Sequence, residues 1–103
     1  MTFLMNINHG FHATMNAQPG RGDEVIALLL AAPSLPHPDC IVFLVGRSAG
    51  NPDVVHVTEG WSSPEAHAAF FATAPAQELV AALQPLLTGS EYSDEVPVGG
   101  KAF

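Results

Sequence analysis

Three residues that could carry acid–base chemistry lie within one short stretch of the chain, 54–71. They are Glu59, Trp61 and His67: an acid, an indole and an imidazole. A carboxyl group among apolar neighbours has a raised pKa and can act as a general base, and an imidazole titrates close to neutral pH. The indole supplies an aromatic wall with a single N–H donor. Each residue also has a structural alternative: Trp61 as core, Glu59 bonded to backbone or solvent, and His67 at the surface.

A strand that runs directly into a helix would position these residues. Residues 54–57 are mostly β-branched and the run closes at Trp61, which predicts a strand. A helix start follows, with a serine N-cap, a proline and an acid at Ser63, Pro64 and Glu65. Phe70 and Phe71 fall one turn after His67 on the same helical face. The sequence therefore predicts that the acid, the indole and the imidazole meet at a strand–helix junction.

The rest of the chain extends this pattern to a β-α-β-β-α-β order. Apolar alternation, apolar runs and flanking turn formers predict strands at 11–17, 40–47, 54–61 and 91–98. The predicted helices lie between Asp23 and Pro33 and between Ser63 and Gly89, the second with a break at 73–75. Two right-handed βαβ halves give a ferredoxin-like α+β fold, with a four-stranded antiparallel sheet and both helices on one face. The other sheet face stays bare, so we expect a homodimer through the sheet faces.

The amino-acid composition limits the possible binding partners and the expected cellular location of the protein. The chain has 103 residues, 48% of them hydrophobic, which predicts one globular domain over 1–103 with a core at about 11–98 between two tails. The net charge of −7, with only three basic residues, argues against binding to nucleic acid or to an anionic membrane. Cys40 is the single cysteine and cannot form an internal disulfide. The first residues make a poor signal peptide, so we expect a cytoplasmic protein.

Four short segments resemble the antibiotic-biosynthesis monooxygenase (ABM) domain family, which includes quinol monooxygenases and small haem-degrading enzymes. They are Pro19-Gly20, Pro38-Asp39-Cys40, Val57-Thr58-Glu59-Gly60-Trp61 and Ser63-Pro64-Glu65-Ala66-His67. The resemblance implies a ferredoxin-like monomer, a homodimer whose two sheets form a β-barrel, and a pocket between each sheet and its own helices. Members described as enzymes often insert oxygen into phenolic or quinol substrates without metal, flavin or haem.

The resemblance gives candidate roles to residues of this chain. Trp61, Phe70 and Phe71 would line the pocket for a small aromatic ligand, with His67 or Glu59 as the catalytic base. Asn51, Arg47 and Tyr92 could each orient a phenolic oxygen, although turn or surface roles are the alternative for all three.

Two cofactor hypotheses are disfavoured by the residues present. The resemblance to the haem-degrading branch would imply a trio of a first-strand asparagine, a third-strand tryptophan and a second-helix histidine. Here Ala13 stands at the asparagine position, and Phe70 and Phe71 stand at the histidine position. His12 and His56 lie on neighbouring predicted strands, on the face opposite the apolar set, yet two histidines without a third ligand make a poor metal site. We therefore expect neither a cofactor nor a metal.

Two functions remain from the sequence. The first is a dimeric, cofactor-independent monooxygenase that oxidises a small hydroxylated aromatic of the quinol or polyphenol type in an apolar pocket. The alternative is a ligand-binding or purely structural dimer of the same fold without catalysis, because one fold hosts many functions. A cavity reached by His67 would favour the enzyme, and a filled space beneath Trp61 would favour the structural protein.

Overall fold

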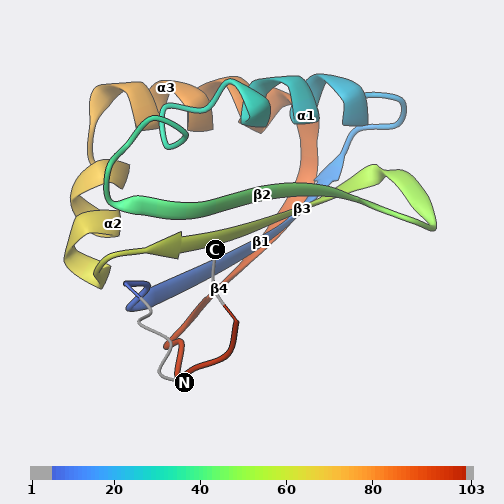
Figure 1. Cartoon of the computed structure of the whole chain (residues 1–103). Coiled ribbons are helices and arrows are strands. Elements are labelled where there is room, and N and C mark those ends of the chain that lie inside the picture. The colour runs from blue at the N-terminus through green and yellow to red at the C-terminus, as the bar shows by residue number, and fades with distance from the viewer. Residues whose placement is uncertain (1–5, 102–103) are drawn as a thin grey trace.

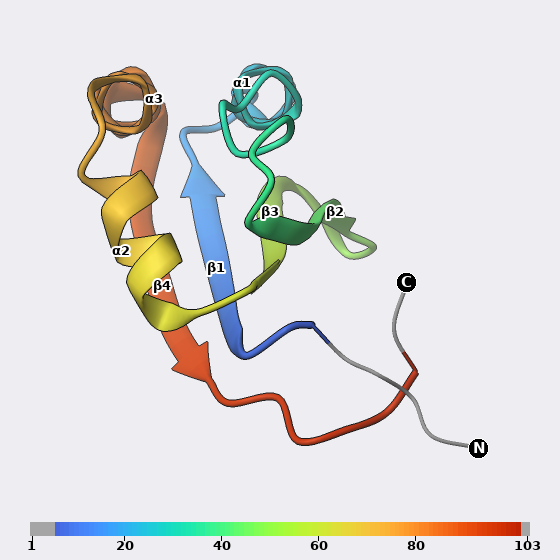
Figure 2. The same ribbon diagram turned by 60° about the vertical axis from the view of Figure 1, so that its left-hand side comes forward.

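A computed structural model describes residues 6–101 and gives eight elements (Figure 1). In chain order they are β1 (His9–Ala17), α1 (Gly22–Leu30), β2 (Cys40–Ser48), β3 (Asn51–Trp61), α2 (Pro64–Phe71), α3 (Ala74–Leu83), the 3-10 turn η1 (Gln84–Leu86) and β4 (Leu87–Glu95). The strands form one antiparallel sheet in the order β2-β3-β1-β4. All three α-helices lie on one side of this sheet (Figures 1 and 2), which confirms the ferredoxin-like α+β prediction.

The second helical region is divided into two helices, as the predicted break at 73–75 implies. The Thr73 hydroxyl accepts a hydrogen bond from the backbone N–H of Ala76 and so caps α3, with Pro75 in its first turn. Ser63 caps α2 in the same way, through the N–H of Ala66. Within residues 6–101, no helix combines the length and apolar character needed to cross a membrane.

The last strand lies earlier in the chain than predicted. The helix ends at Leu83 instead of Gly89, because Pro85 cannot continue the α-helix and lies in the η1 turn. β4 then spans 87–95 instead of 91–98. Gly89 stands within β4, opposite Asn16 of β1. The first strand also begins two residues earlier than predicted, at His9. The earlier start of β1 places His9 on the inner face of the sheet, together with Phe11 and Ala13.

The core follows the alternation of the strands. Ala13, Met15, Val55 and Val57 point to the helices, where Val25 and Leu29 of α1 and Leu83 of α3 cover them. A second, smaller cluster joins Trp61, Phe70 and Ala76 at the strand–helix junction. The opposite face of the sheet has no helix over it in the part of the chain described, and Leu44 is 61% exposed there.

Candidate active site

A cavity of about 870 Å³ lies between the inner face of the sheet and the helices. Its wall is mostly apolar and includes Phe11, Met15, Phe43, Val57, Phe70 and Leu83. The titratable groups on the wall are Glu59, His67, Tyr92 and Asp94. Cavities of a few hundred to about 1,000 Å³ with a few convergent polar groups are typical of small-molecule sites. This chain therefore has room for a small ligand beside a small set of acid–base groups.

Glu59 is held inside this cavity by its neighbour two residues along β3. Side chains at this spacing share a strand face, so Trp61 reaches Glu59, and its indole Nε1–H donates to Glu59 Oε1 at 2.9 Å. The Glu59 side chain is 12% exposed. Burial raises the pKa of this carboxyl group, while the hydrogen bond from Trp61 works in the opposite direction. Glu59 is thus a carboxylate with increased basicity, as a general base requires.

His67 lies on the cavity wall, one turn into α2. Its side chain is 13% exposed, and its Nε2 is 3.8 Å from Glu59 Oε1. The imidazole packs between aromatic rings, with ring centroids 4.9 Å from Phe11 and 5.0 Å from Trp61. Burial lowers the pKa of His67, nearby His9 lowers it further, and Asp94 partly opposes this. The imidazole is therefore neutral at neutral pH.

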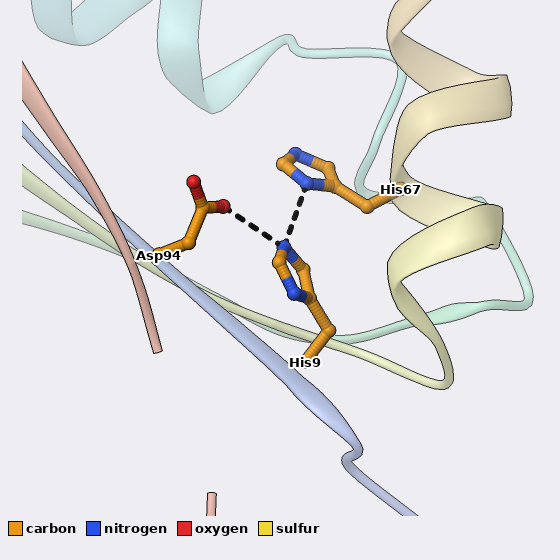
Figure 3. A group of neighbouring side chains, drawn as sticks. All are labelled: His9, His67 and Asp94. Atoms are coloured by element: carbon orange, nitrogen blue, oxygen red, sulfur yellow. Dashed lines mark hydrogen bonds and ion pairs between the residues drawn. The ribbon is translucent and has the colours of Figure 1, made fainter. Parts of the chain in front are cut away.

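Two residues that the sequence analysis did not select complete the polar cluster. His9 Nε2 lies 3.1 Å from His67 Nδ1 and 3.1 Å from Asp94 Oδ1, as Figure 3 shows. The alternation of β1 contained the signal for His9, because His9, Phe11 and Ala13 are alternate residues of one strand and therefore lie on the same face of the sheet. Asp94 likewise lies two residues from Tyr92 on β4, on the same face of the strand. The predicted strand boundaries excluded the first of these residues, and the second was read only as part of an edge strand.

The hydrogen-bond network indicates which nitrogen of His67 carries the proton. A carboxylate only accepts, so Asp94 favours a proton on His9 Nε2, and His67 Nδ1 is then an acceptor. The proton of neutral His67 consequently lies on Nε2, the nitrogen that faces Glu59. In this arrangement Glu59 accepts a proton and His67 donates a hydrogen bond. The two groups therefore have complementary roles towards a ligand hydroxyl.

The aromatic residues of the prediction divide into two layers. Phe70, Phe71 and Tyr92 line the cavity. Trp61 does not: it is fully buried behind the wall, and its ring centroid lies 5.0 Å from those of His67 and Phe70. Trp61 was predicted to form a pocket wall, but it supports the wall residues His67 and Phe70 from behind. The reason is that α2 and His37, in the loop before β2, cover the indole.

Arg47 and Asn51 are placed away from the cavity. The guanidinium Nη2 of Arg47 donates to Asp23 Oδ1 at 2.6 Å, and Asn51 Oδ1 accepts from the backbone N–H of Asp53 at 3.0 Å. Asn51 lies in the part of the β2–β3 hairpin that extends past Val54, where the pairing of β3 with β1 stops, whereas Arg47 lies opposite Val55 on the edge strand β2 and reaches Asp23 of α1. Both side chains therefore serve the hairpin and its contact with α1, as the structural alternative proposed.

The remaining histidines of the sheet lie on its outer face. His12 Nε2 is 2.7 Å from Glu95 Oε1, and His56 is hydrogen-bonded to Thr14 at 3.2 Å. Cys40 is half-buried, and burial together with the charge of Glu59 raises the pKa of its thiol to about 11. A thiol with this pKa is almost entirely protonated at neutral pH and is a weak nucleophile.

Fold and site together define a class of protein: a ferredoxin-like domain with a mostly apolar cavity that contains a buried acid–histidine pair. The profile of the antibiotic biosynthesis monooxygenase family matches residues 9–82. The chain therefore belongs to this family, and the resemblance seen in its sequence is confirmed.

Solved structures agree with this assignment. A Chloroflexus aurantiacus protein that carries the family's name is 34% identical, with 91% of this chain and 96% of that chain covered and a TM-score of 0.81. A Deinococcus radiodurans protein named after the same family is 21% identical, with coverage of 92% and 95% and a TM-score of 0.78. A Mycobacterium tuberculosis protein is 18% identical, with coverage of 91% and 98% and a TM-score of 0.81. The latter two show the shared fold alone. No curated protein matches the chain.

Proposed function

We propose that this protein is a cofactor-independent monooxygenase that oxidises a small hydroxylated aromatic, of the quinol or polyphenol type. The observation that carries the proposal is the Glu59–His67 pair, with 3.8 Å between carboxylate oxygen and imidazole nitrogen, on the wall of a mostly apolar cavity. Family membership supports a monooxygenase, and the cavity chemistry supports a phenolic substrate.

The proposed reaction needs a substrate that reduces oxygen by itself once it is deprotonated. Glu59 takes the proton of a phenolic hydroxyl, and the Nε2–H of His67 donates to the resulting phenolate oxygen. The electron-rich ring then reduces O₂: one oxygen atom becomes a ring carbonyl and the other leaves as water with two substrate hydrogens. A phenol with a free ring position ortho or para to its hydroxyl and O₂ thus give a quinone and water, and the substrate supplies all four electrons that reduce O₂.

The cavity wall supports this chemistry because it is mostly apolar. Phe11, Phe70 and Phe71 offer faces and edges for an aromatic ring, and Tyr92 stacks on Phe11 with ring centroids 5.8 Å apart. Apolar surroundings increase the basicity of Glu59 and strengthen the hydrogen bond from His67 to a developing phenolate. The same wall also fits a non-catalytic binding protein, so catalysis has to be measured directly.

We also propose that the protein works as a homodimer through the outer face of the sheet. In the described part of the chain this face has no helix over it, and Leu44, midway along the edge strand β2, is exposed on it opposite Thr58 of β3. A second copy would cover this face and leave both cavities on the far sides of the two sheets. The two active sites would then be independent of the interface.

Oxygen uptake with a panel of hydroquinones and anthrols tests the proposed reaction. We expect substrate-dependent consumption of one O₂ per quinone formed, in the presence of a metal chelator. Ligand binding without oxygen consumption across the panel would favour the alternative, a non-catalytic binding protein. The absence of both binding and turnover would contradict both hypotheses for this substrate class.

A further inference from the structure

Three residues with metal-binding side chains converge at the edge of the cavity from three separate elements. His9 belongs to β1, His67 to α2 and Asp94 to β4, and one ligand atom of each lies within 4.8 Å of the others. Figure 3 shows the two imidazoles and the carboxylate turned towards one another. His67 and Asp94 also line the cavity, so a ligand held between them is accessible from it.

We propose that His9, His67 and Asp94 bind one divalent transition-metal ion, with its remaining coordination positions open to the cavity. Two imidazoles and a carboxylate suit zinc or ferrous iron, whereas calcium and magnesium prefer all-oxygen sites. The net charge of −7 also favours the approach of a cation. This inference goes beyond the proposed function and does not depend on it.

The distances between the ligand atoms are close to those that a metal requires. His9 Nε2 is 3.1 Å from both His67 Nδ1 and Asp94 Oδ1. Ligand atoms at about 2.0–2.2 Å from one ion are about 3.0–3.4 Å apart, depending on the geometry. Two of the three separations therefore fit already. The third can close through Asp94, because its side chain is 66% exposed and has room to rotate.

The surroundings of His67 include a carboxylate on the side of the ring away from the proposed metal site. A metal-binding histidine binds the ion through one ring nitrogen and directs the other N–H to a carboxylate that fixes the ring. Here Nδ1 would bind the ion and Nε2 faces Glu59 at 3.8 Å, while Glu59 is held in turn by Trp61. Metal binding would thus displace the proton shared by His9 and its neighbours and leave Glu59 and the Nε2–H in place. The metal site and the proposed base are therefore compatible.

A metal titration of the untagged, full-length protein tests this inference without any substrate. We expect calorimetry with Zn²⁺ to give one ion per chain, and Co²⁺ to give visible absorption bands that Zn²⁺ abolishes. His9→Gln and Asp94→Asn should each lower the affinity by at least about tenfold, since even the partners of metal ligands contribute this much. Asp94→Asn is the variant with the smaller risk to folding, because the carboxylate is exposed.

The outer face of the sheet provides matched controls. His12 and Glu95 form a histidine–carboxylate pair of the same type at 2.7 Å, but without a second histidine. His12→Gln and Glu95→Gln should leave the affinity unchanged. The inference is overturned if the wild type shows no saturable binding, or if Asp94→Asn binds Zn²⁺ as tightly as the wild type. Oxygen uptake with and without a chelator is a separate readout: a requirement for metal would contradict the cofactor independence of the proposed reaction and leave the metal site standing.

Discussion

The indole N–H of Trp61 donates a 2.9 Å hydrogen bond to Glu59 Oε1, two residues earlier on the same strand. This bond links the most buried aromatic residue within 6–101 to the carboxylate of the candidate active site. It partly offsets the rise in the pKa of Glu59 that burial causes. The hydrophobic support of α2 and the acid–base character of the cavity therefore depend on the same side chain.

Trp61→Phe should change both the pKa of Glu59 and the stability of the fold. Loss of the N–H donor should raise the pKa of Glu59 further, because burial then acts without the opposing hydrogen bond. The smaller ring also leaves a gap beside His67 and Phe70, with a loss of roughly 1–3 kcal/mol in the free energy of unfolding. Denaturant unfolding measures the stability, and a carbon-13 NMR titration of the glutamate carboxyls measures the pKa. An unchanged pKa for Glu59 would contradict the role given to this bond.

Glu59→Gln should stabilise the fold at neutral pH. The pKa of Glu59 is raised in the folded protein above its ordinary value of 4.5. Below that ordinary value the group is protonated in both states, and its burial carries no charge penalty. As pH rises from this ordinary value to the folded pKa, the unfolded chain loses the proton that the folded protein still holds, so the folded protein loses stability, and above the folded pKa the loss is complete. The difference in Tm between Glu59→Gln and the wild type should therefore increase with pH, as measured by calorimetric scans. A difference that decreases with pH would contradict this reasoning.

The same substitution should strongly reduce turnover if the proposed reaction is correct. Removal of a general base typically costs about 10²–10⁴ in rate. Glu59→Gln should therefore lower kcat for oxygen uptake by this amount, and His67→Leu should lower it as well, because the phenolate loses its donor. Glu95→Gln, an acid on the outer face, is the matched control and should keep wild-type rates. Full activity in Glu59→Gln would exclude Glu59 as the base.

The Cys40 thiol should react slowly with alkylating reagents at neutral pH. Its pKa of about 11 means that the thiolate, the reactive form, is scarce. The rate with iodoacetamide should rise about tenfold per pH unit below that value. Glu59→Gln should increase the rate at a fixed pH, because it removes a negative charge that raises the pKa of the thiol. Glutathione is the reference thiol, and a Cys40 as reactive as glutathione at neutral pH would contradict the prediction.

Leu44→Glu should convert the proposed dimer to a monomer. The new carboxylate would lie on the outer face of the edge strand β2, where a second copy packed on this face would bury it without a partner charge. Leu30→Glu on α1 is the matched control, since Leu30 is 60% exposed and Leu44 61%. Light scattering after size-exclusion chromatography measures the mass of each variant. A monomeric wild type, or a Leu44→Glu variant that stays dimeric, would argue against this interface.

Local patterns were sufficient to predict the fold because each element has its own signal. The alternation in 11–17, the Ser63-Pro64-Glu65 helix start and the break at Thr73 all depend on neighbours in the chain. The end of the second helix was predicted less well. Gly89 is typical of a helix end, but it pairs with Asn16 across the sheet, and no local pattern contains that contact.

The candidate site shows the same division more sharply. Sequence alone determined that Glu59, Trp61 and His67 share one strand–helix junction, because their spacing decides their face and their order. Only the tertiary structure decided that His9 and Asp94 meet His67, since they come from β1 and β4, one before and one after α2 in the chain, and the folding of the sheet brings both strands to that helix. It also decided that Arg47 and Asn51 lie outside the cavity and that Trp61 lies behind its wall. Strand register and helix rotation set these distances, and both depend on how the whole core packs.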